Sequence, residues 1–132
     1  MQKNFIFSDT ETTGLREKDF IQIIQSASIL TDESFERIDA HNIESRPLPW
    51  VVPQPGAYLV HKKISSLDSN ISHYQMMKDI YETWEKWSDD KQTIFITYNG
   101  HQFDEELYRR QFYWNLLPPY ITNTNGNGRS DL

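Results

Sequence analysis

The stretch Asn-Phe-Ile-Phe-Ser-Asp-Thr-Glu-Thr-Thr-Gly at residues 4–14 decides the fold, because an apolar run meets two acidic residues there. Residues 4–8 predict a short buried strand. Asp9 and Glu11 are two positions apart, so a strand that continued through them would project both carboxylates from one face. Two carboxylates held so close repel each other unless a cation lies between them, and Mg²⁺ prefers such oxygen ligands. The stretch therefore predicts either a metal site or an ordinary acidic surface turn.

The sequence on both sides of this stretch predicts an α/β fold. Strands are expected over residues 20–30, 35–43 and 93–98, and helices over about 72–88 and 104–116. The turn at 31–34 favours a hairpin between the second and third strands, whereas residues 45–56 hold four of the six prolines and are expected to form an extended loop. The order βββαβα predicts a mixed sheet with antiparallel strands first and a parallel strand after a crossover helix. The helical spacing within 72–88 indicates a core stripe of Met77, Ile80, Tyr81, Trp84 and Trp87.

Composition limits the classes of protein to which the chain can belong. Its 132 residues suit one domain, and 37% hydrophobic with 14% aromatic content is too high for a disordered chain. The absence of cysteine excludes a disulfide scaffold and thiolate catalysis and fits a cytoplasmic location. We expect no signal peptide and no membrane partner, since no apolar run is long enough for either. The net charge of −6 argues against coating nucleic acid by charge alone, but not against meeting it through bound metal ions.

Other polar residues are candidates for the same site. Asp104 follows the 93–98 strand; it is either a first-turn acid stabilised by the helix dipole or a further metal ligand at the sheet edge. Thr12 and Thr13 offer hydroxyl and backbone N–H groups that could hold a phosphate or a nucleotide sugar. A general base could come from the four histidines, of which 61 and 101 are expected in loops that flank the site.

Two segments together resemble a known family. Residues 8–15, Ser-Asp-Thr-Glu-Thr-Thr-Gly-Leu, resemble the first motif of the DEDD 3′–5′ exonucleases, and residues 98–106, Tyr-Asn-Gly-His-Gln-Phe-Asp-Glu-Glu, resemble the second. The similarity extends to bacterial exonuclease I at residues 53–57, 60–64, 109–120 and 127–132, so it covers nearly the whole chain. The resemblance implies an RNase H-like exonuclease fold.

The resemblance also implies a reaction and a set of site residues. A two-metal enzyme of DNA repair is expected, with Mg²⁺ or Mn²⁺, that degrades single-stranded DNA from its 3′ end to nucleoside monophosphates. Asp9 would bridge both ions, Glu11 would bind one, and Asp104 would bind the second. The residues expected near the DNA strand and its terminal nucleotide are Thr12, Thr13, Leu15, Asn99 and Phe103.

The sequence departs from the family pattern in one respect. The family has a third motif, downstream of the second, with a fourth carboxylate and a His five residues or a Tyr four residues before it. After Asp104 the chain holds only the acids Glu105, Glu106 and Asp131, and no histidine. Ser130-Asp131-Leu132 is expected to be the capped start of a helix. We therefore expect residues 1–132 to be the N-terminal portion of an exonuclease domain, truncated at its C-terminus. A second polypeptide could supply the third motif; the alternatives are an inactive nucleic-acid-binding remnant and a related exoribonuclease or proofreading exonuclease.

Overall fold

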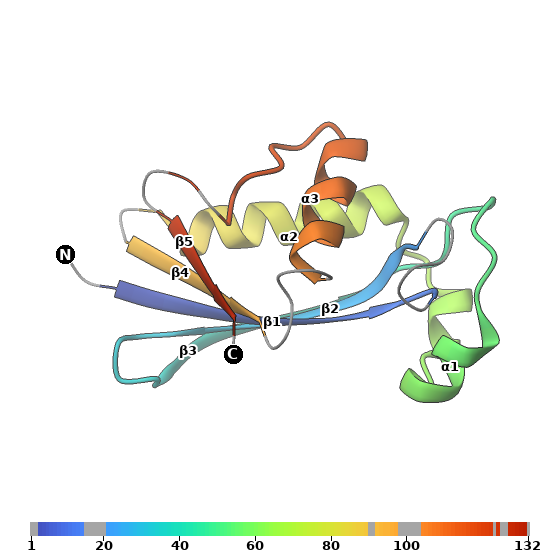
Figure 1. Cartoon of the computed structure of the whole chain (residues 1–132), viewed down its shortest axis with the longest axis horizontal. Coiled ribbons are helices and arrows are strands. Elements are labelled where there is room, and N and C mark those ends of the chain that lie inside the picture. The colour runs from blue at the N-terminus through green and yellow to red at the C-terminus, as the bar shows by residue number, and fades with distance from the viewer. Residues whose placement is uncertain are drawn as a thin grey trace.

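A mixed five-stranded sheet is the frame of the computed structural model (Figure 1). The structure describes residues 3–14, 21–89, 92–97, 104–122, 124 and 127–131, with the backbone alone at 104 and 131. The strands are β1 (Lys3–Thr12), β2 (Ile23–Thr31), β3 (Arg37–Glu44), β4 (Gln92–Thr97) and β5 (Asn127–Asp131), in the spatial order β3-β2-β1-β4-β5. The pairs β1–β2 and β2–β3 are antiparallel, and β1–β4 and β4–β5 are parallel. The expected hairpin and the expected parallel strand are both confirmed.

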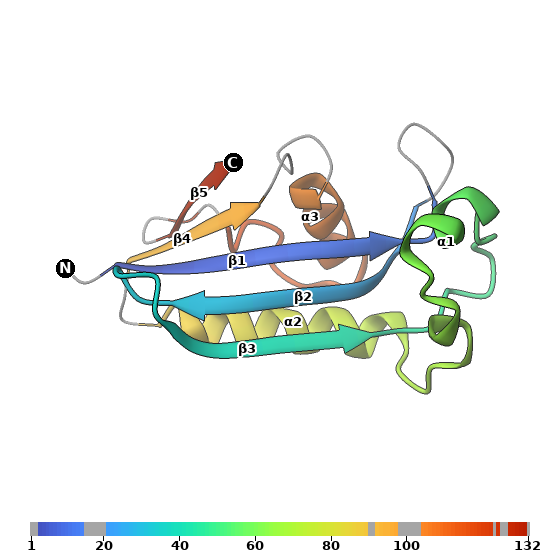
Figure 2. The ribbon, with the colours of Figure 1, turned by 90° about the horizontal axis from the view of Figure 1, so that it is seen from below.

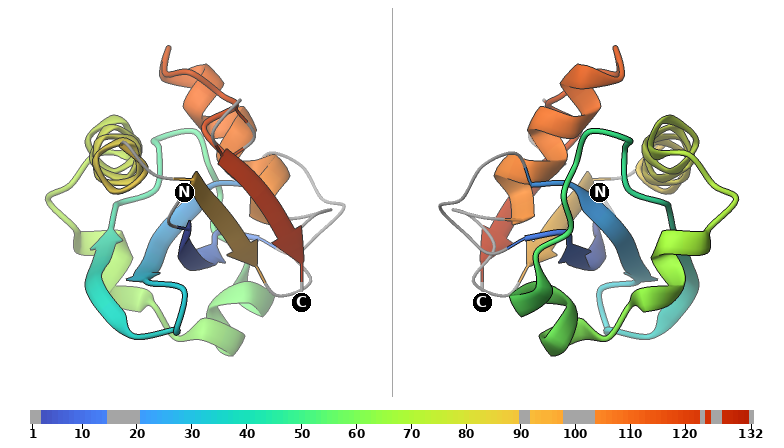
Figure 3. Two further views of the ribbon diagram at one scale, coloured as in Figure 1. Left: turned by 90° about the vertical axis from the view of Figure 1, so that its left-hand side faces the viewer. Right: turned by 90° about the vertical axis from the view of Figure 1, so that its right-hand side faces the viewer.

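Two helices, α2 (His73–Trp87) and α3 (Asp104–Trp114), cover one face of this sheet. Figures 1 and 3 show both on the same side, and Figure 2 shows the opposite face of β1, β2 and β3 in front of them. The short helices α1 (Pro55–His61) and η1 (Ile64–Asp68) lie at the end of the sheet where β1 finishes (Figure 2). Among the described residues, no helix is long and apolar enough to span a membrane.

The core lies between the sheet and the two helices α2 and α3. Helix α2 begins at a capping box in which the Ser72 hydroxyl accepts the Gln75 N–H and the Gln75 side chain accepts the Ser72 N–H. The predicted stripe is confirmed, with Tyr81 partly buried. Trp84 is 1% exposed, and its ring centroid lies 4.7 Å from that of Tyr108 in α3 and 5.1 Å from that of Phe95 in β4.

Alternation along β1 determines which side chains face the core. Ile6 belongs to the core cluster, whereas Asp9 is exposed and Glu11 is partly buried. Because side chains alternate between the two faces of a strand, both acids project from the face opposite α2 and α3. The continuation of β1 through Thr12, beyond the strand expected at 4–8, gives them this common face.

Two expectations about local structure were wrong. Ser130 and Asp131 do not cap a helix but end β5, which pairs with β4 from Thr93↔Asn127 to Thr97↔Asp131. The N–H and C=O groups along the edge of β4 need partners, and pairing with β5 supplies them, which outweighs a local capping signal. The loop expected over residues 45–56 ends earlier than expected, because α1 already begins at Pro55. Proline is accommodated at the first helical position, where the missing N–H would have had no partner within the helix.

Candidate metal and nuclease site

The two acids at the end of β1 interact electrostatically. Partial burial and the charge of Asp9 raise the pKa of Glu11 above its ordinary value of 4.5, while His61 and Lys63 act in the opposite direction. Such a pair releases this repulsion when a divalent cation binds between its oxygens. The donor set therefore fits Mg²⁺ or Mn²⁺.

His61 holds α1 against the end of β1. Its Nδ1 accepts a hydrogen bond from the Lys63 N–H at 2.9 Å, which leaves Nε2 to donate to the Thr12 carbonyl, also at 2.9 Å. Its ring also packs edge-on against Tyr58, 4.6 Å between centroids. Since both ring nitrogens are engaged in the neutral tautomer, His61 lies close to the acids as a structural link and not as a free base.

The turn after β1 is also fixed by internal bonds. The Thr12 hydroxyl donates to the Gly14 carbonyl at 2.7 Å, and the Thr13 hydroxyl accepts the Gln22 N–H at 3.0 Å. A Cβ at Gly14 would lie 2.7 Å from the side-chain Nε2 of Gln54, so a larger residue at this position would displace the end of that side chain. Both threonines are buried, and their contact with a nucleotide stays a prediction.

Asp104 begins α3 at the same end of the sheet as the acid pair. Strand β4 runs parallel to β1, so both strands finish at this end, and α3 follows β4 in the chain. This placement fits a third ligand from the start of α3. The side chain of Asp104, together with Leu15, Asn99, His101 and Phe103, lies outside the described residues. Within the described part, no group of three or more acidic or histidine side chains is arranged to hold a metal.

The remaining described histidines belong to the packing of α2. His73 is buried, which lowers the pKa of its imidazole, and its Nε2 lies 2.8 Å from the Gln111 side-chain oxygen. His41 on β3 pairs with Asp79 on α2 at 2.7 Å. Neither is among the residues at the end of β1. Glu105, which the sequence marks only as one of the acids after Asp104, is buried in the structure.

Comparisons with known proteins identify the same family in sequence and in structure. No family model matches the chain. Exodeoxyribonuclease I of Buchnera aphidicola (from Acyrthosiphon pisum, strain APS) is 31% identical over 133 residues, which cover 98% of this chain and 31% of that protein. The Escherichia coli K12 protein of the same name is 29% identical, over 99% of this chain and 27% of its own length.

Solved structures of exonuclease I are also similar to this chain in fold. Escherichia coli exonuclease I in complex with a dT13 oligonucleotide aligns with a TM-score of 0.87 and 28% identity, over 99% of this chain and 28% of that one. A product-bound exonuclease I structure aligns with the same score over 100% of this chain and 30% of its own. The chain thus spans about three-tenths of the length of the relatives that it matches. Its mixed sheet, its first and second motifs and these matches identify it as the N-terminal region of an exonuclease I-like member of the DEDD exonucleases, with an RNase H-like fold.

Proposed function

We propose that this chain carries the metal-binding residues of a 3′–5′ exonuclease that acts on single-stranded DNA and releases nucleoside monophosphates. The observation that supports it most is the acid pair, Asp9 and Glu11, on the face of β1 opposite α2 and α3. Nearly the full length of this chain matches exonuclease I. Matched exonuclease I structures contain dT13 and dA16 oligonucleotides, which supports single-stranded DNA as the substrate class.

Asp9, Glu11 and Asp104 are the residues we propose as ligands of two Mg²⁺ ions, with Asp9 shared between them. When bound, the ions would lower the pKa of the attacking water and stabilise negative charge on the leaving 3′ oxygen. A zinc-bound form of the Escherichia coli exonuclease I–DNA complex supports metal dependence in the family, and Mg²⁺ or Mn²⁺ is our choice of ion for this chain. The exposed position of Asp9 gives a terminal phosphate direct access to the site.

The described residues do not offer a free general base. His61 and His73 have both ring nitrogens engaged, whereas His41 bonds Asp79 through Nε2 and its Nδ1 is buried without a hydrogen-bond partner. Glu105 and Glu106 are paired with arginines at positions 109 and 110, so neither replaces a fourth metal ligand. The sequence after Asp104 also holds no histidine and no third motif of the family. On that ground we propose that a fourth carboxylate and a base come from a segment outside residues 1–132, on the same or on a second polypeptide. Without that base we expect the rate of this chain alone to fall about 10²–10⁴-fold below that of a complete site.

Release of a 3′-terminal label from single-stranded DNA tests the proposal. The chain is assayed in Mg²⁺, in Mn²⁺ and in EDTA, beside Asp9→Ala and the matched control Glu36→Gln, a carboxylate exposed in the β2–β3 hairpin. We expect slow, metal-dependent release that is lost in Asp9→Ala and kept in Glu36→Gln. Release that survives Asp9→Ala, or no release in either metal, contradicts the proposal; the second result favours a non-catalytic, DNA-binding role.

A further inference from the structure

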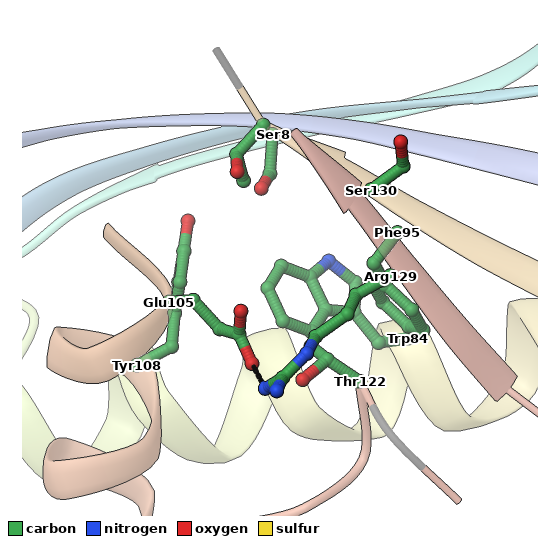
Figure 4. Close-up of a pocket in the computed structure, with 9 residues that line it drawn as sticks. Ser8, Trp84, Phe95, Glu105, Tyr108, Thr122, Arg129 and Ser130 are labelled. Atoms are coloured by element: carbon green, nitrogen blue, oxygen red, sulfur yellow. Dashed lines mark hydrogen bonds and ion pairs between the residues drawn. The ribbon is translucent and has the colours of Figure 1, made fainter. Parts of the chain in front are cut away.

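A small cavity lies on the helix-covered side of the sheet (Figure 4). It measures about 10 Å³, at the lower limit for one water molecule. Its lining includes Ser8, Trp84, Phe95, Glu105, Tyr108 and Arg129. Ser8 directly precedes Asp9 in β1, and Glu105 directly follows Asp104 in α3. The cavity is therefore lined by the sequence neighbours of two proposed metal ligands, Asp9 and Asp104.

The buried carboxylate of Glu105 lines this cavity and is paired with two arginines. Glu105, whose side chain is 7% exposed, accepts hydrogen bonds from Arg109 at 3.0 Å and from Arg129. Figure 4 shows Glu105 reaching from α3 and Arg129 reaching from β5 to meet it. Hydrogen bonds between ionised partners are stronger and more directional than neutral ones, so this contact fixes the groups that carry it.

The two arginines differ in what they connect. Arg109 lies one turn further along α3, so its bond to Glu105 stays within one helix. Arg129 lies on β5, so its bond ties the first turn of α3 to the sheet. Further along the same helix, the Tyr108 hydroxyl lies 2.6 Å from the Ser26 hydroxyl of β2, and the Gln111 side chain accepts the Ile23 N–H at 2.9 Å. These bonds hold the middle of α3, whereas Glu105 holds its beginning.

We propose that Glu105 is a positioning residue, whose ion pair with Arg129 fixes the first turn of α3, and with it Asp104, relative to Asp9 on β1. The inference rests on the proposed function, because it gives Asp104 its role. It goes beyond that function because it assigns a task to two residues, Glu105 and Arg129, that are not among the proposed metal ligands. A loss of this tether lets the start of α3 move away from β1 while the middle of the helix stays attached.

The matched pair Arg129→Gln and Arg109→Gln tests the proposal, since each removes one arginine from Glu105 but only the first cuts the link to the sheet. Mn²⁺ affinity is measured by electron paramagnetic resonance on the whole chain. Residues that orient metal ligands typically contribute about 10–100-fold to affinity, so we expect a loss in that range for Arg129→Gln and less than about twofold for Arg109→Gln. Arg129→Lys, which keeps the charge, should recover part of the loss.

Amide hydrogen exchange separates positioning from general stability. The amides of Tyr108 and Arg109 close the first turn of α3, so Arg129→Gln should speed their exchange far more than that of Tyr113 and Trp114 in the last turn. Equal acceleration along the helix, or equal Mn²⁺ loss in both variants, overturns the proposal. If the wild type binds no Mn²⁺, the proposed function fails, and the exchange pattern alone decides whether the tether exists. If Arg129→Gln does not fold, Glu105→Gln is compared with Arg109→Gln instead, since both lose the bond within the helix but only Glu105→Gln loses the link to β5.

Discussion

Replacing Glu11 by glutamine should stabilise the metal-free chain at neutral pH. Burial first and the charge of Asp9 second raise the pKa of Glu11, so the folded state binds its proton more tightly than the unfolded chain does. The contribution of Glu11 to the free energy of unfolding is therefore fully present below pH 4.5, the ordinary pKa of the group. That contribution is lost as the pH rises through the raised pKa of the folded state. The glutamine variant avoids that loss, because it carries no charge at any pH.

The size of the effect follows from the spacing of the two acids. Residues two apart on a strand are separated by roughly 6.7 Å, where two unit charges repel by about 0.6 kcal/mol in water and about 2.5 kcal/mol at an effective dielectric constant of 20. Asp9 is exposed and Glu11 only partly buried, so solvent screening favours the lower end. We expect a gain of about 0.5–1 kcal/mol in the free energy of unfolding, or roughly 2–4 °C in Tm.

Urea unfolding followed by tryptophan fluorescence in EDTA measures this gain. Glu11→Gln should be more stable than the wild type at pH 7.5 and equal to it near pH 4, while Glu36→Gln should match the wild type at both. With Mg²⁺ at 100 times the wild-type Kd the order should reverse, since the wild type would gain about 2.7 kcal/mol and a variant that binds tenfold more weakly only about 1.4 kcal/mol. A variant that is less stable than the wild type in EDTA at pH 7.5 refutes the reasoning.

Three further predictions concern the scaffold. Trp84→Ala should cost about 3–5 kcal/mol, because the indole is buried between Phe95 and Tyr108, and the urea transition should shift strongly or disappear; an unshifted midpoint contradicts this packing. His73→Gln should flatten the fall in Tm between pH 7.5 and 5.5, since burial lowers the pKa of His73 and the folded state resists the protonation that the unfolded chain accepts near 6.5; parallel pH profiles would count against it. Ser72→Ala should lower the free energy of unfolding by about 1 kcal/mol through loss of the α2 cap, measured from the urea midpoint, and a neutral result would exclude the capping role.

The features that the sequence alone predicted are those set by local pattern. Helix α2 was predicted because its apolar stripe repeats at 3.6 residues and its core positions pack on the sheet. The common face of Asp9 and Glu11 follows from the two-residue period of a strand, once β1 runs on through Thr12. Proline at the start of α1 is a local signal that could have predicted that helix within the proline-rich segment.

Other features depend on contacts between distant residues. Strand β5 contains Asn127, Gly128 and Ser130, whose composition favours a turn, and its pairing is set by the free edge of β4. The bond between His61 and Thr12 joins residues 49 positions apart, and the Glu105–Arg129 pair joins residues 24 apart. Sequence spacing carries no signal for either, because chain folding alone brings those elements together.

The central claim is that Asp9, Glu11 and Asp104 form one divalent-metal site, and Mn²⁺ titration followed by electron paramagnetic resonance tests it most directly. The titration compares the wild type with Asp9→Asn, Glu11→Gln and Asp104→Asn, and with Glu36→Gln as the control. Because each acid supplies ligand oxygens, we predict that each site variant weakens Mn²⁺ binding by about tenfold or more and that the control leaves it unchanged. Equal Mn²⁺ affinity in the wild type and in all three site variants would contradict the account.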